Sequence, residues 1–145
     1  MFKPLMLMAA LILSYPGQDV HVATWSTGTP DSDTYESLSF WIKDNQRAYI
    51  RYAHGKDAEG IDLNWLGPDS LAKAKTRGFR VSSPDPGHAP LLIVPKGDSL
   101  LVFDRQQYDR CFHWENENDS TSAQSCPICA STGKQAMGWL RRYFF

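Results

Sequence analysis

Residues 91–103, Leu-Leu-Ile-Val-Pro-Lys-Gly-Asp-Ser-Leu-Leu-Val-Phe, contain the clearest strand–turn–strand pattern of the chain. Two apolar runs, Leu91–Val94 and Leu100–Phe103, flank Pro95–Ser99, and the composition of this middle segment is typical of a tight reversal. Both runs are apolar on both faces, which predicts strands in the middle of a sheet and not at its edge. The segment therefore predicts an antiparallel hairpin at the centre of a β-rich fold.

The flanking sequence predicts further strands. Residues 38–43 alternate between apolar and other side chains, and Asp44–Gln46 turns the chain into a second alternating stretch over residues 48–53. These two stretches predict another hairpin. Further strands are expected from Val20 onward, over residues 61–65, 79–81 and 108–114, whereas one or two helical turns are expected over residues 70–77, ending at Gly78.

The order of these elements predicts the fold class. About seven strands joined by short links indicate a mainly β fold, an antiparallel β-meander that forms a sandwich or a partial barrel, with α+β as the alternative. A short C-terminal α-helix is expected after Thr132, which has capping-box spacing to Gln135. Its apolar face would contain Met137, Leu140 and Phe144, and it would cover one open end or edge of the sheet.

Composition limits the classes of partner. The chain has 145 residues, of which 42% are hydrophobic and 21% charged, enough for one domain with a real core. Fifteen Lys and Arg against sixteen Asp and Glu give a net charge of −1, so no global basic field favours nucleic acid as a partner. No apolar run reaches the ~18 residues that a membrane span needs.

The N-terminus has the layout of a secretory signal peptide. Lys3 precedes nine apolar residues, Leu5–Leu13, and Pro16-Gly17 then break the segment. We expect residues 1–17 to be the leader and residues 18–145 to be a single β-rich domain in the periplasm or outside the cell. The alternative is a buried helix that opens a cytosolic domain, with Pro4 in its first turn.

Three cysteines allow two kinds of site. In an exported protein Cys111 is expected to be bridged to Cys126 or Cys129, which leaves one thiol free. Closing this loop would stabilise the fold by about 3 kcal/mol. The alternative is a zinc site, because Cys111 and His113 would lie on the same side of a strand and Cys126 and Cys129 would complete a Cys₃His ligand set.

The sequence does not favour catalysis. It contains no nucleophile elbow, P-loop or dinucleotide fingerprint. The four histidines lie near turns or strand ends, and none is paired with an obvious nucleophile. We therefore expect a noncatalytic protein without a cofactor.

Two surface features are candidate partner-binding sites. Residues 115–120 form an acidic segment with the carboxylates Glu115, Glu117 and Asp119, and loops mounted on a rigid scaffold often bind partners. The first hairpin carries four further candidate residues, of a composition typical of interface hot spots: Trp41, Tyr49, Arg51 and Tyr52. A solvated turn and ordinary core packing are the competing interpretations of these two features.

A leader, a small β domain, a cysteine-pinned loop and no catalytic set together resemble the layout of periplasmic inhibitors and immunity proteins. This layout favours an exported, noncatalytic protein-binding domain that neutralises another protein, such as an enzyme or toxin, by occluding its cleft. The first alternative is a carrier of small hydrophobic ligands inside a partial β-barrel. The second is a zinc-stabilised cytosolic module.

Overall fold

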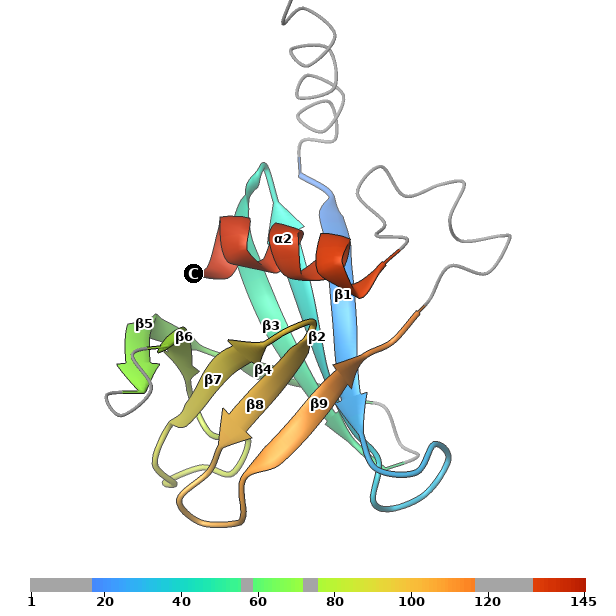
Figure 1. The fold of residues 1–145 in the computed structure, drawn as a ribbon, viewed down its shortest axis with the longest axis vertical. Coiled ribbons are helices and arrows are strands. Elements are labelled where there is room, and N and C mark those ends of the chain that lie inside the picture. Colours follow the sequence, from blue (N-terminus) through green and yellow to red (C-terminus); the bar gives the residue numbers. More distant parts are fainter. Residues whose placement is uncertain (1–16, 56–58, 72–75, 117–131) are drawn as a thin grey trace, which may run out of the picture.

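The computed structural model describes residues 17–55, 59–71, 76–116 and 132–145. These residues form an antiparallel sheet and one helix, which confirms the mainly β fold and the short C-terminal helix (Figure 1). The elements are β1 (Asp19–Thr27), β2 (Glu36–Lys43), β3 (Gln46–His54), β4 (Ile61–Leu63), β5 (Trp65–Leu71), β6 (Thr76–Val81), β7 (Leu91–Lys96), β8 (Ser99–Phe103), β9 (Arg110–Trp114) and α2 (Gly133–Phe144).

The sheet curls into a nearly closed barrel. Its order is β4-β3-β2-β1-β9-β8-β7-β6-β5, so two meanders are joined where β9 returns to pair with β1. The two outermost strands, β4 and β5, are consecutive in the chain and are separated by Asn64 alone. The Asn64 N–H donates to Ser82 Oγ at 2.8 Å, and the Asn64 carbonyl accepts from the Ser82 N–H at 2.9 Å. One bent segment thus passes from one half of the sheet to the other.

Aromatic side chains fill the barrel interior. Phe40 lies at the centre, with its ring centroid 5.5 Å from that of Trp25, 6.2 Å from that of Phe79 and 5.2 Å from that of Phe144. All three contacts are edge-to-face, the arrangement that aromatic pairs prefer. These four residues and Phe112 are fully buried. The interior is therefore a packed core.

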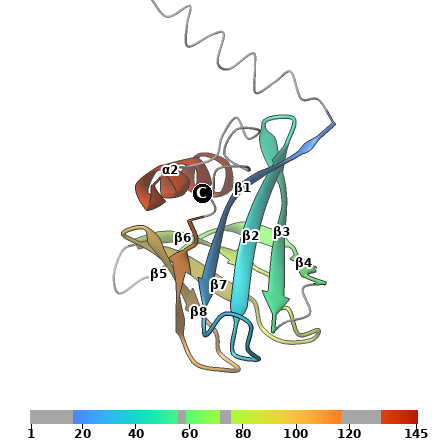
Figure 2. The same ribbon diagram turned by 90° about the vertical axis from the view of Figure 1, so that its right-hand side faces the viewer.

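Helix α2 covers one end of the barrel (Figure 2). The Thr132 Oγ1 accepts the Gln135 N–H at 3.1 Å, which confirms the expected N-cap. Met137, Leu140 and Phe144 are buried as predicted. A Cβ atom on Gly133 would lie 2.4 Å from Asp98 Oδ2, so glycine allows the β7–β8 turn to approach the first turn of the helix. The carboxylate of Asp98 then interacts favourably with the helix dipole.

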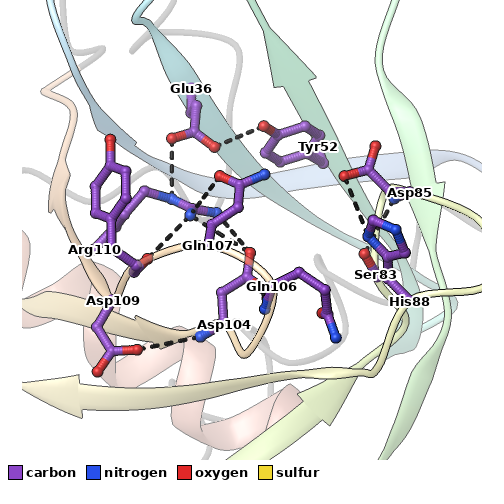
Figure 3. Close-up of polar contacts among 11 residues, drawn as sticks. Glu36, Tyr52, Ser83, Asp85, His88, Asp104, Gln106, Gln107, Asp109 and Arg110 are labelled. Atoms are coloured by element: carbon purple, nitrogen blue, oxygen red, sulfur yellow. Dashed lines mark hydrogen bonds and ion pairs between the residues drawn. The ribbon is translucent and has the colours of Figure 1, made fainter.

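A buried polar cluster closes the opposite end (Figure 3). Arg110 Nε lies 3.0 Å from Glu36 Oε1, and Arg110 Nη2 lies 3.5 Å from Asp104 Oδ2. The Nε–H does not point at the Glu36 oxygen, so this contact is an ion pair without an aligned hydrogen bond. Tyr52 donates its hydroxyl to Glu36 Oε2 at 2.6 Å, and Arg110 Nη1 donates to Gln107 Oε1 at 3.0 Å. The cluster ties β2 and β3 to the β8–β9 turn.

The structure corrects the expected helical turns over residues 70–77. Ser70 and Leu71 belong to β5 and pair with Arg77 and Thr76 of β6, while residues 72–75 lie outside the described residues. Strand pairing overrides the helix propensity of this stretch. Gly78 does not end a helix; it permits a close strand approach, since a Cβ atom there would lie 2.1 Å from the Ile93 carbonyl oxygen.

Two further details differ from the expectation. The sheet has nine strands and not about seven; one reason is that the stretch expected as one strand over residues 61–65 is broken at Asn64, after which β5 begins. The last strand begins at Arg110 and not at Tyr108. Over the described ranges no helix combines the length and apolarity that a membrane span requires.

Candidate functional site

Three of the predicted partner-binding residues lie together on the outer wall of the barrel. Trp41 on β2 and Tyr49 on β3 are cross-strand partners, and their rings stack with centroids 5.5 Å apart and an interplanar angle of 17°. The guanidinium carbon of Arg51 lies 5.2 Å from the Tyr49 ring centroid, and Arg51 Nε donates to Asp62 Oδ1 on β4 at 3.1 Å. We call Trp41, Tyr49 and Arg51 the outer aromatic patch.

The pleat of the strands explains this placement. Side chains alternate between the two faces of a strand, so burial of Phe40 and Ile50 in the core turns Trp41, Tyr49 and Arg51 outward. Tyr52 has the opposite parity. It is buried, and burial together with its hydrogen bond to Glu36 raises the pKa of its hydroxyl above the usual value. The expectation that Tyr52 belongs to the same surface is therefore corrected: Tyr52 is a core residue.

His21 on β1 borders the outer aromatic patch. Its ring centroid lies 4.8 Å from that of Trp41, and its Nε2 lies 2.8 Å from Thr24 Oγ1, which in turn lies 2.9 Å from Ser39 Oγ. Burial lowers the pKa of His21, although a backbone hydrogen bond at Ala23 and the charge of Glu115 act in the opposite direction. The neutral imidazole is thus the favoured form beside Trp41. The sequence did not identify His21 as a site residue, because its proximity to Trp41 depends on the β1–β2 register.

Glu115 is anchored beside β1. Its backbone N–H donates to the Thr24 carbonyl at 2.9 Å, and its carboxylate Oε2 accepts a hydrogen bond from the Tyr35 hydroxyl. Burial, reinforced by this hydrogen bond, raises the pKa of Tyr35 to about 12. Glu115 is half-buried and partnered, so it differs from the freely solvated carboxylate expected of a loop. Glu117 and Asp119 lie outside the described residues.

The cysteine hypotheses stay predictions. Cys111 is half-buried on the outer face of β9 and forms no disulfide with a described residue. His113 is exposed, with Nδ1 3.2 Å from Ser99 Oγ. Cys126 and Cys129 lie outside the described residues. Within the part of the chain that the structure describes, no group of three or more His, Cys, Asp or Glu side chains is arranged to hold a metal ion.

Two surface hollows lie away from the outer aromatic patch. The larger, of about 580 Å³, lies between α2 and the β7–β8 turn. It is lined by Gly97, Asp98, Lys134, Met137, Gly138 and Arg141. The smaller, of about 330 Å³, is lined by Arg80, Pro90, Leu92, Phe103, Asp104, Arg105 and Asp109. Neither hollow includes a residue that the sequence indicated as a site.

Comparisons of this chain with protein-family models, with curated proteins and with solved structures give no match.

Proposed function

We propose that the protein is an exported, noncatalytic protein-binding domain of the inhibitor or immunity type, which occludes the cleft of a partner enzyme or toxin. One observation carries the proposal: a stacked Trp41–Tyr49 pair with Arg51 beside it on the outer wall of a barrel whose core is already filled. Trp, Tyr and Arg are the residues most enriched among interface hot spots. Export rests on the sequence of residues 1–17.

The outer aromatic patch is held in one conformation before any partner arrives. Trp41 and Tyr49 sit on paired strands and restrict each other by stacking, and Asp62 holds Arg51 in place. Binding would then order few additional side chains, which strengthens association without further contacts. His21 and Glu115 continue this surface across β1, so a polar rim adjoins the aromatic centre.

The alternative functions receive less support. A carrier needs an apolar cavity inside the barrel, but Trp25, Phe40 and Phe112 are fully buried in a packed interior. The zinc-stabilised module depends on Cys126 and Cys129, which lie outside the described residues. Occlusion by the outer wall therefore stays the function that the geometry supports best.

Affinity capture with matched variants tests the proposal. The tagged protein is incubated with cell and culture extracts beside Trp41→Ala/Tyr49→Ala and a control, Tyr108→Ala, which removes an aromatic side chain that is 73% exposed on the β8–β9 turn. We expect one protein to be retained in equimolar amount by the wild type and by the control. The purified partner should bind the double variant at least about 30-fold more weakly, since hot-spot truncations cost ~2 kcal/mol or more.

Two results would overturn the proposal. One is the absence of any equimolar partner of the wild type. The other is equal affinity of the partner for the wild type and for the Trp41→Ala/Tyr49→Ala variant, after circular dichroism has shown that the variant is folded.

A further inference from the structure

The exposed face of α2 is basic. The helix contains Lys134, Arg141 and Arg142 and has no acidic residue, although the whole chain has a net charge of −1. All three cations are exposed, and none forms an ion pair with a described residue. The helix therefore concentrates positive charge at one end of the barrel.

Neighbouring turns extend this positive surface. The β2–β3 turn contacts the helix, because the Tyr143 hydroxyl donates to Asn45 Oδ1 at 2.7 Å, and the β7–β8 turn lies against Gly133. Lys43 and Lys96 flank these two turns and are exposed. We call Lys43, Lys96, Lys134, Arg141 and Arg142 the basic end. The carboxylates that face it are Asp19, Asp44 and Asp98.

The opposite end is acidic. Figure 1 shows the turns over residues 28–35, 82–90 and 104–109 at the end of the barrel away from α2. The only exposed arginine or lysine in these turns is Arg105. Against it stand four exposed aspartates, Asp31, Asp33, Asp85 and Asp109, whereas Asp104 is buried and paired with Arg110. The described residues thus form a barrel with opposite charge at its two ends, which orients it toward a negative surface.

The hollow beside α2 fits an amphiphile. Its lining includes the buried Met137, the exposed Gly138, the exposed cations Lys134 and Arg141, and the carboxylate of Asp98. A mostly apolar hollow of about 580 Å³ with two cations and one carboxylate suits a ligand that has a phosphate at one end and hydrocarbon at the other.

Aromatic residues beside the cations favour a lipid surface over an acidic protein. The guanidinium carbon of Arg141 lies 5.3 Å from the Phe145 ring centroid, and that of Arg142 lies 5.8 Å from the Trp139 ring centroid. Trp and other aromatic residues beside cations are typical of membrane–water interfaces.

We propose that the basic end docks on an anionic phospholipid surface, with a headgroup phosphate between Lys134 and Arg141 and the adjoining acyl carbons over Met137 and Gly138. In this orientation the acidic end points away from the membrane. The outer aromatic patch lies on the side wall of β2 and β3, so docking leaves it accessible to a partner.

Vesicle binding of the full-length chain tests the proposal. Vesicles of phosphatidylcholine alone are compared with vesicles that also contain phosphatidylglycerol, so that any uniform contribution of residues 5–13 cancels. We expect tighter binding to the anionic vesicles, and Arg141→Glu should weaken it about 30-fold, because each charge near such a surface changes binding about fivefold. The matched control Arg105→Glu makes the same charge change at the acidic end and should have little effect.

A second variant tests the hollow beside α2. A Cβ atom at Gly138 meets no other atom within 4 Å, so Gly138→Gln places a polar, uncharged side chain in the hollow without changing the charge or the core. We expect it to weaken binding to the anionic vesicles as well. Equal binding to both vesicle types, equal loss in Arg141→Glu and Arg105→Glu, or unchanged binding of Gly138→Gln would each overturn the proposal. So would binding of polyglutamate as tight as that of the anionic vesicles, which would point to an acidic protein.

Discussion

Replacing Arg110 by Met should destabilise the fold severely. The Arg110 side chain is 4% exposed and lies between the carboxylates of Glu36 and Asp104, which are 9% and 7% exposed. Met keeps much of the side-chain volume but leaves two buried carboxylates without their cation. Breaking a buried ion pair in this way costs about 3–5 kcal/mol. Because a domain is stable by only about 5–15 kcal/mol in total, the free energy of unfolding should fall by a large fraction.

Urea unfolding, followed by tryptophan fluorescence, measures this loss. The control is Arg105→Met on the same turn, where an exposed arginine is replaced and the free energy of unfolding should change by less than about 0.5 kcal/mol. Tyr52→Phe removes only the hydroxyl that donates to Glu36 and should cost about 1–3 kcal/mol. A loss below about 1 kcal/mol in Arg110→Met, with an unchanged denaturant slope, would refute the view that this cluster holds the barrel end together.

Four further outcomes are expected. Burial lowers the pKa of His21 below its usual value of 6.5, so the neutral imidazole stabilises the fold at every pH above 6.5. That stability is lost as the pH falls through the lowered pKa. His21→Gln should abolish this part of the pH dependence of Tm. The pKa of Tyr35, raised from 10.0 to about 12, gives a contribution that is complete below pH 10.0 and lost as the pH rises toward 12. Absorbance titration should show late-titrating tyrosines, Tyr35 and Tyr52 among them, and Glu115→Gln should move one of them to lower pH. Gly78→Ala should lower the free energy of unfolding by about 1–3 kcal/mol, since its Cβ meets the Ile93 carbonyl. In the same urea assay Gly138→Ala should raise the free energy of unfolding by up to ~1 kcal/mol, because alanine is a better helix former and its Cβ meets no atom within 4 Å. Protein recovered from an exporting bacterial host should lack about 17–23 N-terminal residues by intact mass, and the full-length mass would contradict this expectation. Thiol counting without reduction should find one free thiol, and three free thiols would contradict the expected disulfide.

Local periodicity accounts for the parts of the fold that the sequence predicted. The hairpin over residues 91–103 appears as β7 and β8 with Val94 opposite Leu101, and Thr132 caps the final helix. Each of these features depends on residues close together in the chain. Residues 70–77 show the limit of this reasoning, because Ser70 and Arg77 pair with each other across β5 and β6, and helix propensity does not weigh this strand pairing.

The candidate site was predicted in part for the same reason. Alternation along one hairpin places Trp41, Tyr49 and Arg51 on one face, and this could be read from residues 38–53 alone. The same alternation places Tyr52 with Ile50 on the opposite face, so grouping Tyr52 with the other three was wrong, and Tyr52 is buried in the core. His21 and Tyr35 were missed because their partners, Trp41 and Glu115, come from other parts of the chain.

The sequence by itself therefore determined the β class, the turns, the capped helix and the faces of individual strands, since pleat and helix period act between near neighbours. Tertiary structure alone decided that β9 pairs with β1, that β4 continues into β5, and that α2 and the Arg110 cluster close opposite ends of the barrel. Tyr35 and Glu115 are hydrogen-bonded although they are 80 residues apart. Such contacts form only when the whole aromatic core packs at once, because their partners are chosen by burial and shape and not by position in the chain.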